Sequence, residues 1–212
     1  MAILKRCRMK SDDRREQLLL AGGELLGQRS YEDVSIEEIA QAAGISKGLL
    51  YHYFPTKKDF LIAVFRREVD KVTEITAPDG SLGPLEQIDA SLDAFLAYAE
   101  RRGSGYALLL RTRGGGDPDI RAVLDEARER RAQAVLDGVA AWLPPGADRD
   151  SPALRSAIQG WISFVEGVLL RWLDERDLTR EQLRELFRSV LVDALRAAAL
   201  LDPRLRLDAA VA

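Results

Sequence analysis

The 212-residue chain is poor in several residue types, and each shortage excludes a class of protein. Its one cysteine, Cys7, cannot form an internal disulfide, which favours a reducing compartment. Its one histidine, His52, has no cysteine pair or suitably spaced carboxylate in the sequence to complete a metal site. No apolar run approaches the roughly 18 residues that cross a bilayer, and the basic N-terminus lacks the apolar stretch of a signal peptide. We therefore expect a cytoplasmic protein with no membrane segment, no metal and no cofactor.

Sequence signatures of enzymes are missing as well. No nucleophile and base stand at a spacing typical of a catalytic pair, and one histidine leaves few options for acid–base chemistry. Gly114, Gly115 and Gly116 lack the following lysine and hydroxyl residue of a phosphate-binding loop, so we interpret them as a flexible connection. We therefore expect that the protein is not an enzyme.

Hydrophobic residues make up 47% of the chain and charged residues 31%, a composition that supports a sizeable core in a helix-rich protein. The net charge of −3 argues against a nucleic-acid-binding protein, but the charge is unevenly distributed. Residues 1–58 contain ten basic and eight acidic residues, a net charge of +2, whereas the remainder carries −5. This difference favours a small anion-binding module joined to an acidic body.

The spacing of apolar residues is helical along nearly the whole chain, and no alternation typical of strands persists. Capping residues and prolines mark where the helices begin. We expect about nine helices, at residues 12–28, 36–43, 46–53, 57–76, 84–101, 105–112, 118–143, 152–174 and 179–201. The fold class is therefore predicted to be all-α.

A helix-turn-helix pattern lies between residues 35 and 53. Ser35 and Glu38 form a capping-box pattern, and Gly44 ends the first short helix in the left-handed conformation that glycine adopts easily. Ser46 caps the next helix after a turn of Gly44 and Ile45. Two short helices joined by a glycine turn are typical of DNA-binding proteins, although the pattern also occurs in proteins that bind no DNA.

The second helix of such a motif enters the major groove of double-stranded DNA with its N-terminal residues against the bases. Lys47 can donate to guanine or to phosphate, Leu49 can contact a thymine methyl group, and Gly48 permits close approach. His52 projects from the same helix and either contacts DNA or is solvated. We therefore expect the start of this helix to select the base sequence.

Aromatic and basic residues follow directly. We expect Tyr51 and Phe54, three residues apart, to pack inward on the preceding helices, whereas the Tyr53 hydroxyl reaches a phosphate. Lys57 stands at the start of the next helix, where its ammonium and the unpaired backbone N–H groups form an anion site.

These residues match a known family. The matching elements are Arg15-x-x-Leu18-Leu19-x-Ala21, Tyr31, Val34-Ser35-Ile36-x-x-Ile39-Ala40, and Ala43-Gly44-Ile45-Ser46-Lys47-Gly48-x-Leu50-Tyr51-x-Tyr53-Phe54-Pro55-Thr56-Lys57-x-x-Phe60-Leu61. Residues 14–60 thus resemble the DNA-binding domain of tetracycline-repressor (TetR) family regulators. The resemblance implies a helix-turn-helix domain with a basic N-terminal arm at residues 1–57, and a helical ligand-binding and dimerisation domain at 58–212. The DNA-binding residues expected on this basis are Ser35, Ser46, Lys47, Gly48, Leu49, His52, Tyr53 and Lys57.

The sequence departs from the family at a few positions. The family usually has alanine at the position of Gly22 and glycine at that of Ser30. Gly22, Gly23 and Gly27 should each cost about 1 kcal/mol relative to alanine within a helix. Leu49 replaces a small or hydroxyl residue, so the operator preference of relatives cannot be transferred.

The last two predicted helices are strongly apolar. Helix 152–174 is apolar more than halfway round and helix 179–201 carries an apolar stripe, so the pair needs cover on two sides. Gly160 and Gly167, seven residues apart, would let another helix approach closely. We expect a homodimer through helices 152–174 and 179–201, with a wholly intrachain bundle as the alternative.

The larger domain contains candidate residues for the wall of a ligand pocket: Phe95, Tyr98, Tyr106, Leu109, Trp142, Trp161, Phe164 and Glu166. Each is also explained as ordinary core. Glu166 is a carboxylate amid apolar residues, and if buried it needs a partner, either an arginine such as Arg111 or a ligand donor. An exposed or interface position for Glu166 is the alternative.

Taken together, these patterns predict a sequence-specific, DNA-binding transcriptional regulator. We expect a homodimeric repressor that a small hydrophobic effector releases from double-stranded operator DNA. An activator or a ligand-independent regulator of the same fold, or a protein-interaction module, are the alternatives. No motif identifies the operator, the effector or the controlled genes.

Overall fold

Helices make up the regular structure of this protein. The computed structural model describes residues 11–28, 34–77, 79–111 and 117–205, and gives only the backbone for residues 11–13, 26–28, 84, 103–111 and 141. This part of the chain contains no strand, which confirms the all-α prediction. Its elements are α1 (Ser11–Gln28), α2 (Ile36–Ala42), α3 (Lys47–Tyr53), α4 (Lys57–Ile75), α5 (Pro84–Arg111), α6 (Pro118–Val139), α7 (Pro152–Glu175) and α8 (Arg180–Leu201), with short 3-10 helices at Ala140–Trp142 and Pro203–Leu205.

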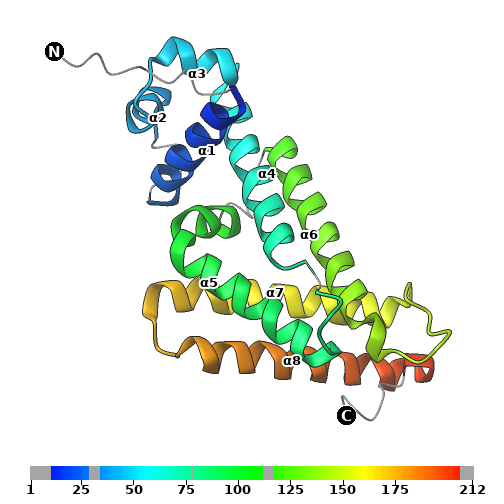
Figure 1. Cartoon of the computed structure of the whole chain (residues 1–212). Coiled ribbons are helices and arrows are strands. Elements are labelled where there is room, and N and C mark those ends of the chain that lie inside the picture. The colour runs from blue at the N-terminus through cyan, green and yellow to red at the C-terminus, as the bar shows by residue number, and fades with distance from the viewer. Residues whose placement is uncertain (1–10, 29–33, 78, 112–116, 206–212) are drawn as a thin grey trace.

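The helices are arranged along an elongated molecule. Figure 1 shows α1, α2 and α3 together at one end, and α7 and α8 side by side at the other. Helices α4 and α6 run alongside each other between the two ends, and α5 packs on α1, α7 and α8. Since α4 begins beside α3 and ends in the body, it links the helix-turn-helix mechanically to the rest of the chain. None of the described helices is long and apolar enough to span a membrane.

Side-chain caps set most of the helix starts, as the sequence predicted. Ser35, Thr56 and Thr179 each accept a hydrogen bond from the backbone N–H three residues later, and each forms a reciprocal capping box. Asp117 caps α6 ahead of the proline at its first position. Ser151, which precedes α7, does not cap its helix with its side chain. Its hydroxyl donates instead to Asp202 Oδ2 at 2.9 Å.

The described residues hold eight α-helices, not the nine expected. Residues 84–101 and 105–111 belong to one helix, α5, which departs from helical geometry at Arg102 (φ −122°, ψ 16°). The kink at Arg102 falls where the sequence predicted one helix to end and the next to begin. The expected helix 118–143 instead ends at Val139 and tightens into a 3-10 turn.

A close contact between α1 and α4 overturns the expectation that Gly22 weakens its helix. A Cβ built on Gly22 would lie 2.1 Å from Phe60 Cζ, whereas one on Gly23 would meet Val64 Cγ1 at an ordinary 3.5 Å. Phe60 is fully buried and packs edge-to-face on Phe54, with ring centroids 5.0 Å apart. Gly22 is therefore needed for packing, because any side chain there would displace this ring.

The expected inward position of Tyr51 is also wrong. Tyr51 is 41% exposed, whereas Phe54 is 2% exposed, as predicted. The buried residues of this segment are Leu50 and Phe54, four apart, and Tyr51 lies about 100° further round the helix than Leu50. Its ring instead faces the Lys47 ammonium at 5.8 Å.

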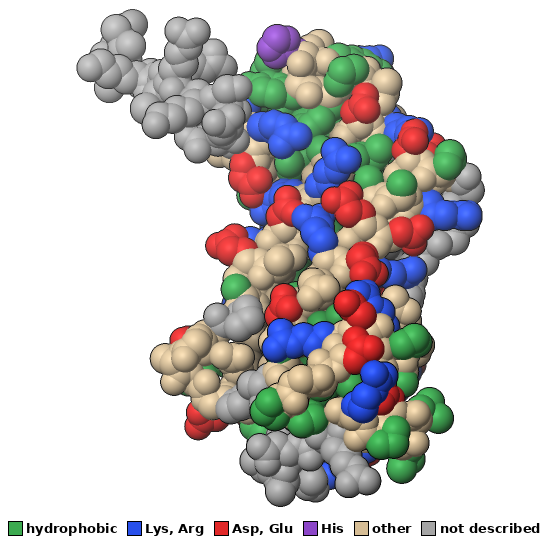
Figure 2. Space-filling view, turned by 90° about the vertical axis from the view of Figure 1, so that its right-hand side faces the viewer, with side chains coloured by type: hydrophobic (Ala, Val, Ile, Leu, Met, Phe, Trp, Pro, Cys, Tyr) green, Lys and Arg blue, Asp and Glu red, His purple; other side chains and the backbone are tan. Residues whose placement is uncertain are grey.

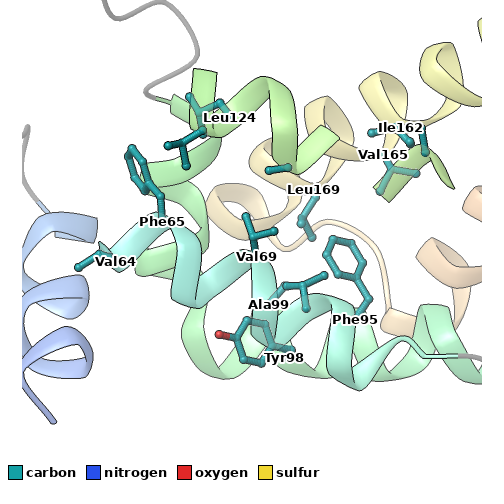
Figure 3. Packing of buried hydrophobic residues seen from close by; sticks show 14 of the residues in the cluster. Val64, Phe65, Val69, Phe95, Tyr98, Ala99, Leu124, Ile162, Val165 and Leu169 are labelled. Carbon is teal, nitrogen blue, oxygen red and sulfur yellow. The ribbon is translucent and has the colours of Figure 1, made fainter. Parts of the chain in front are cut away.

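The core continues without interruption from the helix-turn-helix into the body. Figure 3 shows Val64 of α4 turned toward α1, Phe65 next to Leu124 of α6, and Val69 on the side of Leu169 of α7 and of the α5 residues Phe95 and Ala99; Ile162 and Val165 lie farther along α7. A displacement of α4 would therefore disturb contacts at both ends of the molecule.

Candidate nucleic-acid interface and ligand cavity

A short, well-defined turn presents helix α3. Gly44 has φ +66°, the left-handed conformation expected for it. The Ile45 N–H donates to Ala40 O at 2.9 Å, and Ser46 caps α3 by accepting from the Leu49 N–H at 3.2 Å. The backbone therefore fixes the direction of α3 relative to α2.

The outward face of α3 is open. Lys47, Leu49, Tyr51 and His52 are all exposed, with Leu49 at 38%. A Cβ on Gly48 would meet no atom within 4 Å, so none of the described residues occupies the space beside it. This face has the side chains and the clearance needed to enter a DNA groove.

Lys47 is tied to the preceding helix. Its ammonium forms an ion pair with the carboxylate of Glu37, in the first turn of α2. This hydrogen bond raises the pKa of Lys47 and lowers that of Glu37. The two side chains are 52% and 58% exposed, so the pair lies on the surface beside α3. Sequence reasoning missed Glu37.

Three more residues predicted to contact DNA are the capping residue Ser35 and the half-buried residues Tyr53 and Lys57. Ser35 uses its hydroxyl in the cap of α2, where it accepts from the Glu38 N–H at 3.2 Å and donates to Glu38 Oε2 at 2.8 Å. Tyr53 is half-buried and its ring lies 5.6 Å from that of His52, edge to face. Lys57 is the first residue of α4 and is half-buried.

The adjacent lysines 57 and 58 have different surroundings. Lys58 is turned toward the body, where its ammonium pairs with Asp117 at 3.0 Å and also with Asp119, at the start of α6. The hydrogen bonds to Asp119 and Asp117 raise the pKa of Lys58. Lys58 thus links the two long helices near the helix-turn-helix.

Charge on the side seen in Figure 2 is mixed. Blue and red side chains are interleaved along the length of this face, and neither sign forms a continuous patch. The excess of positive charge inferred from the sequence therefore does not appear on this face as a broad basic surface. On this face, contact with DNA would rest on individual positions and not on a continuous basic surface.

A cavity of about 120 Å³ lies in the body, enclosed by α4, α5, α6, α7 and α8. Its wall is mostly apolar, with a few polar groups: Val72, Thr76, Gln87, Ile88, Ser91, Leu92, Phe95, Arg131, Ala134, Val135, Gly138, Trp161, Ile162, Val165, Glu166 and Leu191. A Cβ on Gly138 would meet no atom within 4 Å. Concave apolar sites with a few convergent polar groups are typical of small-molecule binding.

Some of the predicted pocket residues belong to this cavity and others do not. Phe95, Trp161 and Glu166 line it. Trp142 is buried elsewhere in the core, and Phe164 is half-buried against the Phe187 ring, with centroids 6.1 Å apart. The side chains of Tyr106 and Leu109 lie outside the described residues.

Glu166 is buried and ionically paired at the edge of the cavity. Its carboxylate accepts a hydrogen bond from the Arg131 guanidinium, and Arg128 Nε lies 3.9 Å from its other oxygen. The suggested partner Arg111 has a side chain outside the described residues. The pair brings one cation and one anion together on an otherwise apolar wall.

A second buried carboxylate, Glu68 of α4, has three partners on two helices. It accepts from the Tyr98 hydroxyl at 2.5 Å and from Arg67 Nη1 at 2.6 Å, and Arg102 Nη2 lies 3.8 Å away. Tyr98, which was expected to line the pocket, is buried at this junction instead. Burial, and then the hydrogen bond to Glu68, raise the pKa of Tyr98.

The same arginines extend the Glu68 network to α1. Arg67 Nε donates to Glu16 Oε1 at 2.6 Å, and Arg102 Nη1 donates to Glu24 Oε1 at 3.1 Å. The network therefore joins α1, α4 and α5, and Arg102 is the residue at which α5 bends. Glu68 was missed, although a lone carboxylate among Val64, Phe65, Val69 and Val72 is the same signal that singled out Glu166.

Intrachain packing already covers much of α7 and α8. Most large apolar residues of α7 are buried in the chain itself, namely Leu154, Ile158, Trp161, Ile162, Val165, Leu169 and Trp172, whereas Phe164, Val168, Leu170 and Leu173 are half-buried. Gly160 and Gly167 are exposed, and a Cβ on either would meet no atom within 4 Å. On α8, Leu186 is an exposed large apolar residue, at 36%.

Comparison with family models covers both parts of the chain. Residues 18–64 match "Bacterial regulatory proteins, tetR family". Residues 84–198, more than half of the chain, match "Tetracyclin repressor-like, C-terminal domain". The first match spans the later part of α1, α2, α3 and the start of α4, and the second spans α5, α6, α7 and most of α8.

Curated relatives are transcriptional regulators. The chain is 34% identical over 170 residues to the transcriptional regulator AcuR of Cereibacter sphaeroides, covering 74% of each protein. It is 32% identical over 132 residues to the HTH-type transcriptional activator FasR of Mycolicibacterium smegmatis, covering 61% of this chain and 60% of FasR.

Solved structures share the fold. A tetR-family transcriptional regulator from Streptomyces coelicolor superposes with a TM-score of 0.75 at 28% identity, covering 93% of this chain and 86% of that one. AibR, solved in complex with isovaleryl coenzyme A and operator DNA, superposes with a TM-score of 0.62 at 22% identity, covering 81% of this chain and 94% of AibR.

Proposed function

This chain belongs to the tetR family of bacterial regulatory proteins, which are DNA-binding transcriptional regulators and not enzymes. We propose that it is a homodimeric repressor that leaves its operator when a small hydrophobic effector fills the cavity in the body. The observation that carries this proposal is that Val72 of α4 and its C-cap residue Thr76 line the cavity, while the same helix begins at Lys57, shortly after the recognition helix α3.

The proposed DNA contacts divide into base and phosphate contacts. Lys47, Gly48, Leu49 and His52 lie on the exposed side of α3 and would face the base edges. The Tyr53 hydroxyl and the Lys57 ammonium would hold phosphates. Phosphate contacts position the protein, whereas base contacts specify the sequence.

Ser35 and Ser46 would act on DNA chiefly through the backbone. Their side chains cap α2 and α3 and so orient the first turns of both helices. The N–H groups in those turns, with the Ser46 hydroxyl proton, would meet the phosphates on either side of the groove, whereas the Ser35 hydroxyl donates to Glu38.

The effector would be small and largely apolar, with one polar end. The cavity wall is aromatic and aliphatic except near Thr76, Ser91, Gln87 and the Arg131–Glu166 pair. A cavity of about 120 Å³ is small compared with pockets that enclose drug-sized molecules. A short acyl group therefore fits this wall, and the acyl thioester bound in AibR supports that class of effector.

The buried network around Glu68 supports coupling between effector and DNA. Glu68 stands one helical turn before the cavity residue Val72, and Tyr98 one turn after the cavity residue Phe95. An effector that pushes α4 and α5 apart would therefore act first on the Tyr98–Glu68 hydrogen bond. Through Arg67 and Arg102 the displacement would reach α1 of the helix-turn-helix. Thermodynamically the effector needs only to bind the DNA-free arrangement more tightly.

An activator is the alternative to the proposed repressor. FasR is named a transcriptional activator, so an activator on the same fold is a second candidate. In-vitro transcription from a promoter that carries the bound sequence separates the two. A repressor lowers the yield of transcript and an activator raises it.

Binding measured in both directions tests the proposal. Bound duplexes are first isolated from genomic fragments, and their affinity is then measured by fluorescence anisotropy with and without short-chain acyl coenzyme A thioesters and the matching free acids. We expect an active compound to weaken DNA binding about 5- to 150-fold, and the operator to weaken binding of that compound by the same factor. A compound that binds the cavity tightly but leaves operator affinity unchanged would refute effector release.

A further inference from the structure

Glu37 places a carboxylate directly on the lysine that opens the recognition helix. The ion pair crosses from the first turn of α2 to Lys47 at the first position of α3. Both side chains are more than half exposed, and exposed ion pairs contribute little to stability. The neighbouring Glu38 has a structural task, since it accepts from the Ser35 N–H at 2.7 Å in the capping box. Glu37 has no part in that cap, so its position calls for another explanation.

A carboxylate beside a DNA groove restricts what the groove can contain. It accepts hydrogen bonds but donates none, so it gains only from the exocyclic amino groups of cytosine or adenine. Guanine O6, thymine O4 and the phosphates are themselves acceptors, and they would oppose it. Because Lys47 carries the matching positive charge, the pair presents a donor and an acceptor side by side.

We propose that Glu37 is a specificity-determining residue that acts through Lys47. This inference rests on the proposed docking of α3 in the major groove. When the groove offers an amino-bearing base opposite Glu37, both members of the pair are satisfied. When it offers a keto base, the carboxylate finds no donor on the DNA, stays paired with Lys47 and keeps Lys47 from the phosphates. Glu37 therefore lowers affinity for non-cognate DNA more than for the operator.

Selection from a pool of random double-stranded oligonucleotides tests this assignment, using the full chain and its Glu37→Gln variant. Wild type is expected to select cytosine or adenine at one position of each half-site. The variant is expected to accept guanine and thymine there, because an amide both donates and accepts. The preference for cytosine or adenine over guanine or thymine should fall by about 5- to 150-fold, the range of one good base contact. On a scrambled duplex, the slope of the logarithm of the binding constant against the logarithm of salt concentration should become steeper by about 0.9 in the variant, because Lys47 can then reach a phosphate.

Two further variants separate a role through Lys47 from a simple change of charge. Glu74→Gln removes one carboxylate charge from another exposed ion pair, between Glu74 and Lys71 at 2.9 Å, at the far end of α4. This variant should leave base selection and the salt dependence of DNA binding as in wild type. In a Lys47→Gln background, Glu37→Gln should change selection less than in the wild-type background, because no Lys47 ammonium remains for the carboxylate to hold.

Two outcomes would overturn the assignment. One is a Glu37→Gln variant that selects the same bases with the same discrimination as wild type. The other is an effect of equal size in the Lys47→Gln background. If wild type selects no sequence at all, the proposed docking of α3 fails, and this inference fails with it. That result differs from the two outcomes above, in which wild type does select a sequence.

Discussion

The hydroxyl of Tyr98 donates a hydrogen bond to Glu68 Oε2 at 2.5 Å, and both side chains are buried. The bond joins α5 to α4 one helical turn from the cavity, at the junction with α1. A buried carboxylate needs such donors, because burial without them is costly. The bond therefore stabilises the fold at the place where cavity and helix-turn-helix meet.

Tyr98→Phe removes this donor and changes little else in shape. We expect the free energy of unfolding to fall by about 1.5–3 kcal/mol, the range for a hydrogen bond to a charged group. Urea titration followed by circular dichroism measures the loss. Tyr51→Phe is the matched control, since Tyr51 is exposed, and it should change stability by less than about 0.5 kcal/mol. Equal stability of wild type and Tyr98→Phe would contradict the structural role given to the bond.

Two adjacent glycines of α1 should respond in opposite directions to alanine. Gly22→Ala would place a methyl group 2.1 Å from the buried Phe60 ring, and overpacking of this kind costs about 1–3 kcal/mol. Gly23→Ala meets only Val64 at 3.5 Å, so the higher helix propensity of alanine should stabilise the protein by up to about 1 kcal/mol. Thermal unfolding of the two variants measures both effects. Stabilisation by Gly22→Ala would show that Phe60 yields easily.

The contrast between these glycines shows which features of the fold can be predicted from the sequence and which cannot. The caps at Ser35, Ser46 and Thr56 and the turn at Gly44 are local signals, because each depends on residues within one helical turn, and the structure confirms them. Gly22 and Phe60 meet only after α1 and α4 pack together. Helix propensity alone therefore gave the wrong sign for Gly22.

The cavity was harder to predict for the same reason. Its wall draws on five helices, and aromatic content alone could not separate the cavity residues Phe95 and Trp161 from Trp142, which belongs to the core. The arginine beside Glu166 comes from α6, at Arg131, and no sequence spacing relates the two. Tyr51 was misplaced because its spacing of three residues from Phe54 was taken to put both side chains on the buried face.

Gly138 offers a way to fill the cavity without disturbing the fold. It lines the cavity, and an added Cβ there meets no atom within 4 Å. Gly138→Leu should therefore fold normally and bind DNA as wild type does, but should lose the response to the effector. Gly138→Ala, which adds one methyl group, is the control and should keep most of that response. The measurement is operator binding by anisotropy with added effector. Unchanged release of Gly138→Leu by the effector would place the ligand elsewhere.

Gly167 tests the proposed dimer face. It is exposed on α7 with open space beside it, so Gly167→Arg should leave the fold of one chain intact. If α7 and α8 pair with their symmetry mates, the added side chain prevents close approach and the protein becomes monomeric. Gly80→Arg, at an equally open surface glycine in the loop before α5, is the matched control. Analytical ultracentrifugation distinguishes the states. A dimeric Gly167→Arg would exclude this face as the interface.

Gly48 gives the most direct test of the central claim, that α3 enters the DNA groove. It is exposed, and an added Cβ meets no protein atom within 4 Å, so Gly48→Leu should fold at least as stably as wild type. The measurement is fluorescence anisotropy of a duplex selected by the wild-type protein, against a scrambled duplex. Wild type should bind the selected duplex at least about 1,000-fold more tightly, and Gly48→Leu should lose that preference because its side chain occupies the space of the DNA. A folded Gly48→Leu that binds the selected duplex as tightly as wild type would contradict the account.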